Sequence, residues 1–129
     1  MVDTHGLVWY ALERWKKLGK AARRVLSAAD KGEAVVHVPT IVLVEIGELE
    51  RLGRIRLRGG LRRWTRDLFS RESFRPAELN AEIALEAHSL HRVQERGDRL
   101  IAATAVHLDL PLITRDRALG TAAGVRTIW

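Results

Sequence analysis

The sequence predicts one α/β domain, in which a central, mostly parallel sheet of four to five strands is flanked by helices. Two observations support this fold class. Short apolar runs alternate along the chain with longer segments whose apolar residues recur at helical spacing. The pattern is continuous over all 129 residues, a length that suits a single domain with a sizeable core. Residues 1–129 are therefore expected to form one domain.

The amino-terminal half shows two strand signals and several helical ones. A very short strand is expected to end at Asp3, and a second covers residues 34–38, an apolar run that Pro39 closes. Helices are expected over residues 7–15, 20–29, 41–52 and 61–69, with Thr40 as the N-cap of the third. Between the last two, residues 54–60 alternate arginine with apolar residues and are expected to be extended or a loop.

The carboxyl-terminal half is organised around residues 98–116. Small and apolar residues from Leu100 to Val106 predict a helix pressed against a sheet, and residues 112–114 predict the next strand. Because such a helix runs antiparallel to the strand that follows it, Asp98 and Asp116 are expected at the same sheet edge, where ligands bind in open α/β sheets. The other expected elements are a short strand near Phe74, a helix over 81–93, a short helix or loop over 117–123 and a final strand over 125–129.

Charge and composition narrow the class of protein. The chain carries 22 Lys and Arg against 16 Asp and Glu, and most of these cations are arginines, whose planar guanidinium binds phosphate with two hydrogen bonds. This indicates a polyanionic partner; a surface charged only for solubility is the alternative. The absence of cysteine excludes disulfides and thiolate metal sites, and no apolar run approaches the roughly 20 residues of a membrane span. We expect a soluble, cytoplasmic protein that does not enter the membrane.

Four acids are expected to converge at the carboxyl edge of the sheet. On a helical wheel, Glu45 falls within the apolar arc of its helix, where an unpaired carboxylate is costly, and it lies about one turn after a strand. Asp3 ends the first strand at the same edge, beside Asp98 and Asp116. Four carboxylates would repel one another strongly without a cation, and hard divalent ions prefer oxygen ligands. The sequence therefore predicts a Mg²⁺ or Mn²⁺ site made by these four acids.

Each acid also has a purely structural interpretation. Asp3 and Asp98 are suitable N-caps for the helices that follow them, and Asp116 suits a turn. Glu45 can instead pair with a single arginine, such as Arg99. The convergence of all four on one edge is what favours the metal site over these separate roles.

Several segments resemble, in order and spacing, the PIN-domain nucleases. They are Asp3-Thr4-His5, Val44-Glu45-Ile46, residues 98–105 and residues 112–116. The likeness covers the whole chain and is greatest to the VapC toxins of VapBC toxin–antitoxin pairs. Many of these relatives have Asp-Pro-x-Asp where this chain has Glu95-Arg96-Gly97-Asp98, so here the preceding acid is longer and the loop lacks proline.

The resemblance implies a parallel sheet between helices, a Mg²⁺- or Mn²⁺-dependent endoribonuclease that cleaves RNA, a homodimer and an inhibitory antitoxin. Asp3, Glu45, Asp98 and Asp116 would be both the catalytic and the metal-binding residues. A housekeeping RNA-processing nuclease, a DNA nuclease and a non-catalytic binding module remain alternatives. A phospho-accepting receiver domain would need a lysine late in the chain, and none follows Lys31.

Other polar residues are candidates for supporting roles in such a nuclease. Thr4 and Thr114 can orient carboxylates or bound water, or satisfy helix ends and strands. Arg99, Arg115 and Arg117 can hold phosphates on either side of the scissile bond, or pair with the acids. A further basic run could follow a nucleic-acid backbone, with Trp64 stacking on a base, or could be a solvated face with Trp64 in the core or a dimer contact. That run comprises Arg54, Arg56, Arg58, Arg62, Arg63 and Arg66.

Overall fold

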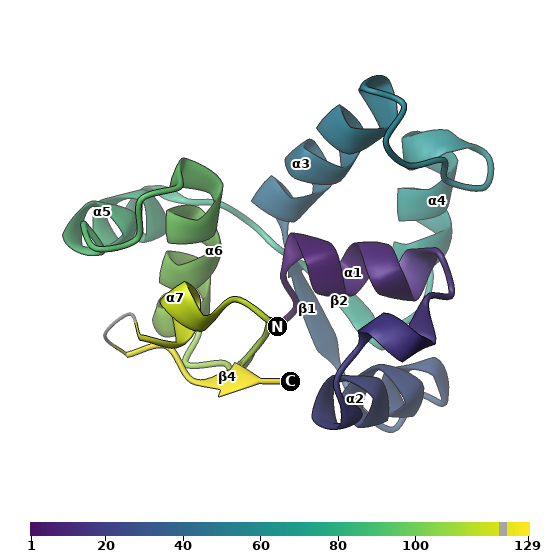
Figure 1. The fold of residues 1–129 in the computed structure, drawn as a ribbon, viewed down its shortest axis with the longest axis horizontal. Helices are drawn as coiled ribbons and strands as arrows, with labels where there is room; N and C mark the ends of the chain where they lie inside the picture. The colour runs from purple at the N-terminus through teal and green to yellow at the C-terminus, as the bar shows by residue number, and fades with distance from the viewer. Residues whose placement is uncertain (122–123) are drawn as a thin grey trace.

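Helices surround short parallel strands in the computed structural model, which describes residues 1–121 and 124–129 (Figure 1). The helices are α1 (Thr4–Ala11), the 3₁₀ helix η1 (Trp15–Lys17), α2 (Lys20–Asp30), α3 (Thr40–Arg51), α4 (Gly60–Phe69), α5 (Ala81–Ser89), α6 (Arg96–His107) and α7 (Arg117–Gly120). The strands are β1 (Val36–Pro39), β2 (Phe74–Ala77), β3 (Leu112–Ile113) and β4 (Thr127–Ile128). Figure 1 shows α5, α6 and α7 on one side of the molecule and α1 to α4 on the other.

Side-chain caps fix the starts of α1 and α5. The Asp3 carboxylate accepts the N–H of Gly6 at 2.6 Å at the start of α1, and Asn80 accepts the N–H of Ile83 at 2.8 Å at the start of α5. Such caps satisfy amide groups that have no carbonyl partner within the helix. Both starts are therefore encoded locally in the sequence.

Two helices end earlier than the sequence predicts. The first stops short of Trp15, because Glu13 adopts a positive φ of 54°. The fifth stops at Ser89 instead of Val93, because the chain leaves helical geometry at Leu90. Leu90 and Val93 are both buried. The early end of α5 lets both side chains enter the core, a tertiary gain that helical periodicity does not reveal.

The strands form two parallel pairs, β1 with β2 and β3 with β4. Their registers are Val36↔Phe74 through Pro39↔Ala77, and Leu112↔Thr127 with Ile113↔Ile128. Between the pairs lies the segment 1–3, in which Val2 bridges Ile113 in parallel and donates its N–H to the carbonyl of His37 at 3.1 Å. The predicted single sheet of four to five strands is not confirmed. The segment 1–3 forms one bridge rather than a strand.

The parallel pairing still brings the ends of several segments to one edge. α1 follows the segment 1–3, α3 follows β1, and α7 follows β3, so all three helices begin near the carboxyl ends of parallel segments. α6 precedes β3, and its amino end returns to the same edge, as predicted. α3 packs against both α1 and α6. No helix in the described part of the chain is both long and apolar enough to cross a membrane.

Candidate active site

The four predicted acids all lie near helix amino ends at this edge. Asp3 is the N-cap residue of α1 and Asp116 that of α7. Asp98 lies in the first turn of α6, and Glu45 in the second turn of α3. Helix amino ends carry a partial positive charge, which favours a nearby carboxylate.

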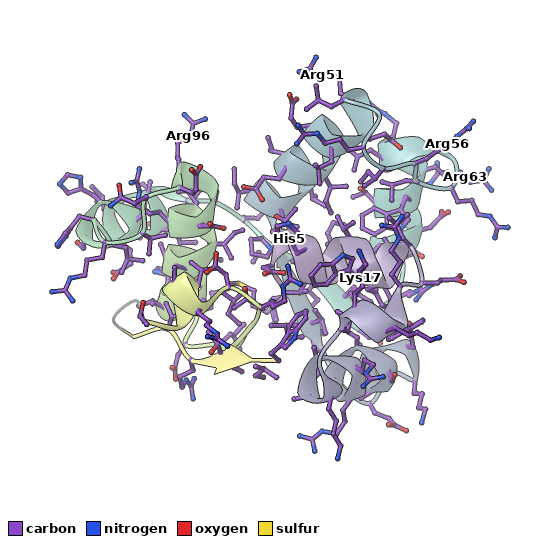
Figure 2. The ribbon with its side chains drawn as sticks, viewed as in Figure 1. His5, Lys17, Arg51, Arg56, Arg63 and Arg96 are labelled. Atoms are coloured by element: carbon purple, nitrogen blue, oxygen red, sulfur yellow. The ribbon has the colours of Figure 1, made fainter. Side chains whose placement is uncertain are left out.

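A cleft of about 590 Å³ between α1, α3 and α6 is lined by Asp3, Glu45 and Asp98. Asp116 lines a smaller adjoining cleft of about 260 Å³. Asp3 and His5 line both, so the two clefts share a wall. Figure 2 shows His5 near the centre of the view, at the start of α1. The sequence-predicted convergence thus brings three acids to one cleft and the fourth next to it.

A purely structural role, as a helix cap, is found for Asp3 and Asp116 but not for Asp98. Asp3 does cap its helix, and the Asp116 carboxylate accepts the N–H of Ala118 at 2.7 Å, so both acids have a capping role. For Asp98 the capping interpretation is wrong, because α6 begins at Arg96 and Asp98 lies inside it. The Asp98 carboxylate has no hydrogen bond to any residue that the structure describes. Neither a capping role nor a hydrogen bond therefore explains why Asp98 lies in the cleft.

Two threonine side chains form hydrogen bonds with the acidic residues of the site. The buried Thr4 hydroxyl donates a hydrogen bond to Oε2 of Glu45. Oγ1 of the buried Thr114 accepts the N–H of Asp116 at 3.0 Å, and burial raises the pKa of Asp3 while the Thr114 side chain opposes that rise. The two threonines, singled out from the sequence, therefore lie against the acids.

Burial and nearby negative charge disfavour the charged forms of Asp3 and Asp98. Burial is the main cause that raises the pKa of Asp3. Burial and then nearby negative charges raise the pKa of Asp98 to about 6. The contributing charges, in decreasing order, are those of Asp116, Glu45, Asp3 and Glu95. The carboxylates are therefore close enough to interact, and the site carries an excess of negative charge.

The donor chemistry of the site fits a hard divalent cation. Carboxylates are the ligands that Mg²⁺ and Mn²⁺ prefer, and a cation would relieve the repulsion that Asp98 experiences. Among residues 1–121 and 124–129, no three His, Cys, Asp or Glu side chains are grouped closely enough to form a ready-made metal site. This agrees with the division of the acids between two clefts and with the hydrogen bonds that hold Asp3, Glu45 and Asp116.

Arg99 lies away from the acids. Its guanidinium donates hydrogen bonds to the carbonyl oxygens of Val93 and Gln94, both at 3.2 Å, and lines a separate pocket between α5 and α6. The alternative pairing with Glu45 is therefore wrong. In this arrangement Arg99 secures the loop before α6 and does not line either acidic cleft.

Arg115 and Arg117 do lie beside the acids, since both line the smaller cleft with Asp116. The Arg115 guanidinium lies 5.0 Å from the centroid of the Trp9 ring, a cation–π contact that restricts it. Two of the three arginines predicted to flank the acids are thus placed where a phosphate at the cleft could reach them.

Sequence reasoning missed two residues that shape the site. His5 lines both clefts and packs against Trp9 with the two rings tilted by 42° and their centroids 5.7 Å apart. Gly97 lies so close to Glu45 that a Cβ atom there would be 1.8 Å from Oε1. Their positions in the sequence could have pointed to both residues, because His5 is close to Asp3 and Gly97 adjoins Asp98.

The chain belongs to the PIN domain family: the PIN domain model matches residues 1–125. PIN domains are nucleases, and they generally use divalent metal ions.

Two solved structures share the fold along nearly the whole chain. One is the crystal structure of VapBC2 from Rickettsia felis bound to a DNA fragment from their promoter, with a TM-score of 0.72, 14% identity, and coverage of 99% of this chain and 96% of that one. The other is a toxin-antitoxin complex from Klebsiella pneumoniae, with a TM-score of 0.64, 18% identity, and coverage of 99% and 94%. No curated protein matches the chain by sequence.

Proposed function

We propose that this chain is a Mg²⁺- or Mn²⁺-dependent endoribonuclease that hydrolyses RNA phosphodiester bonds as the toxin of a type II toxin–antitoxin pair. The observation that carries the proposal is the acidic cleft, in which Asp3, Glu45 and Asp98 meet and Asp116 adjoins. The PIN family match makes a nuclease the natural use of such a cleft. A non-catalytic module would gain nothing from acids that repel one another in a half-buried site.

Asp3, Glu45, Asp98 and Asp116 would hold the divalent ion, partly through water. When bound, such an ion lowers the pKa of a water molecule and stabilises negative charge on the phosphate. In this chain, Thr4 would fix the orientation of the Glu45 carboxylate through its hydrogen bond, and Thr114 would hold the backbone of Asp116. Arg115 and Arg117 would bind a phosphate next to the scissile one.

The toxin role rests on the two similar solved structures, which are toxin–antitoxin complexes and whose fold covers 99% of this chain. By analogy, we expect a cognate antitoxin, a homodimer and a cytoplasmic location. Co-expression with a small reading frame beside the gene should restore growth that the toxin alone arrests. Cleavage of RNA without growth arrest would favour a housekeeping RNA-processing nuclease instead.

The direct test uses purified protein, with RNA and DNA strands of one sequence incubated in chelator, Mg²⁺ or Mn²⁺. We expect internal cuts in RNA only when an ion is present, and no cuts with a Glu45→Gln variant. Cleavage of the DNA strand would make the protein a DNA nuclease. Binding without cleavage under every ion condition would reduce it to a nucleic-acid-binding module.

Thr4→Val is expected to reduce RNA cleavage about 10-fold, in the lower part of the range seen when a partner that orients a metal ligand is lost. Valine has nearly the shape of threonine but cannot donate the hydrogen bond to Glu45. The matched control is Thr4→Ser, which keeps the hydroxyl and should keep most of the activity. The test compares the cleavage rates of the two variants at saturating metal. Equal rates would mean that this hydrogen bond does not position Glu45.

A further inference from the structure

An ordered basic segment borders the acidic cleft. We define the arginine segment as residues 54–63, which link α3 to α4 and form the first turn of α4. Arg54, Arg56 and Arg58 are exposed, whereas Ile55 is half-buried and Leu57 is buried. The period-two pattern seen in the sequence therefore has a structural meaning, because alternate side chains point outwards and inwards.

Glu50 holds this segment in place. Its carboxylate oxygens accept the N–H of Leu57 at 3.2 Å and the N–H of Leu61 at 2.9 Å. Between these contacts, Gly59 and Gly60 adopt positive φ angles of 79° and 77°, which glycine tolerates without strain. The exposed arginines are thus carried on a backbone that one acidic side chain holds at two points.

The segment continues from the cleft that Asp98 and Glu45 line, because Arg54 lines that cleft too. Figure 2 shows Arg56 and Arg63 projecting outwards from the corner of the molecule formed by the end of α3 and the start of α4. A chain that leaves the acidic cleft along α3 would therefore meet the exposed arginines next.

The charges of these arginines are largely uncompensated. Within the described chain, Arg54, Arg56, Arg58 and Arg62 form no ion pair. Arg63 makes an exposed pair with Asp67 at 3.7 Å, which is weak in water. An acidic cleft repels a polyanion unless cations nearby hold it, so a nuclease with this cleft needs such a surface.

Resting on the proposed ribonuclease function, we propose that the arginine segment binds the phosphate backbone of single-stranded RNA where the strand leaves the acidic cleft. Binding of the RNA phosphate backbone fits this surface better than base stacking, because Trp64 is half-buried and packs against the core. It also fits better than a protein interface, whose centre is usually apolar, because Ile55 and Leu57 point inwards.

The test measures binding of a labelled single-stranded RNA of mixed sequence across a series of salt concentrations, with Asp98→Asn present in every protein to prevent cleavage. In single strands, each phosphate contact contributes about 0.7 to the slope of log affinity against log salt. Replacing Arg54, Arg56 and Arg58 by glutamine should therefore reduce that slope by about 2, equivalent to an approximately 20-fold smaller loss of affinity between 50 and 200 mM salt.

The matched control replaces Lys20, Arg23 and Arg24 of α2 by glutamine, an equal change in net charge at exposed positions. We expect its slope to fall by less than half as much. Equal reductions in the two triple variants would overturn the proposal, because net charge alone would explain them. An unchanged slope in the arginine-segment variant would also overturn the proposal. The proposal would be overturned as well if this variant bound RNA as before but no longer bound a co-expressed partner protein.

A second variant tests the role of Glu50 as a positioning residue. Glu50→Ala removes a negative charge, which by itself should strengthen RNA binding, but it also removes both backbone contacts of the segment. We expect weaker binding and faster amide exchange at Leu57 and Leu61. Stronger binding would overturn the ordered-segment proposal. Wild-type cleavage is assayed separately, so failure of the nuclease function can be told from failure of this binding surface.

Discussion

Asp98→Asn is expected to make the metal-free protein more stable and, in the same molecule, to reduce RNA cleavage by more than about 100-fold. The loss of activity follows from its proposed role as a direct metal ligand, since losing a mere supporting partner costs about 10- to 100-fold. The gain in stability follows from its surroundings. Asp98 is half-buried, receives no hydrogen bond from the described residues, and lies within the field of other acids.

The size of this stability effect depends on pH. The pKa of Asp98 is raised from 3.8 to about 6 in the folded protein, so the folded state holds this proton more tightly than the unfolded state. The contribution of protonated Asp98 to the stability of the folded protein is fully present below about pH 4, and it is lost as the pH rises through 6. At pH 7 the charged Asp98 therefore destabilises the fold. Because the side chain is partly solvated, we expect asparagine to recover about 1 kcal/mol, or about 4 °C in Tm.

Thermal unfolding in chelator at pH 7 and pH 4 measures this difference. The Tm of Asp98→Asn should exceed that of the wild type at pH 7, and the two should converge at pH 4. Glu33→Gln, at an exposed acid outside both clefts, serves as the control and should leave the Tm nearly unchanged. A lower Tm for Asp98→Asn at pH 7 would mean that Asp98 supports the fold, contrary to its predicted role.

Topology explains why much of this site could be predicted from the sequence. Asp3 and Asp116 follow parallel segments, and Asp98 precedes one on an antiparallel helix, so their shared edge follows from the order of elements alone. Glu45 could be placed by its position in the helix after β1. The helix over residues 20–29 and the loop over 54–60 were also predictable from local signals, because charge, glycine and periodicity mark them.

The features that could not be predicted depend on contacts between distant residues. Leu52, the last residue of the helix expected over residues 41–52, lies just after the end of α3, is 50% exposed and lines the acidic cleft. Arg99 was expected to flank the acids, but two backbone carbonyls of the preceding loop bind its guanidinium instead. In each case the residue type and spacing allowed several orientations, and packing against another element selected one. The assignment of Mg²⁺ or Mn²⁺ to the acids depends on their chemistry and stays a prediction.

Gly97→Ala is expected to reduce RNA cleavage about 100-fold while leaving the fold as stable as before, because displacing a reacting group by about 1 Å can cost that much. The added Cβ would lie 1.8 Å from Oε1 of Glu45, far inside contact distance, so the flexible Glu45 side chain must move. Gly97 is in the first turn of α6 and does not have a positive φ. Alanine therefore suits its backbone and favours the helix by up to about 1 kcal/mol, which offsets the cost of moving Glu45.

A double-mutant cycle with Glu45→Asp separates this steric effect from a general disturbance of α6. The shorter aspartate side chain withdraws the carboxylate from the added methyl group, so Gly97→Ala should cost much less activity in that background than in the wild type. Cleavage rates and Tm values are measured for all four proteins at saturating metal. Additive losses of activity, with the full cost of Gly97→Ala retained in the Glu45→Asp background, would show that the alanine acts on Asp98 or on the helix itself. The close approach of Gly97 would then have no role in positioning Glu45.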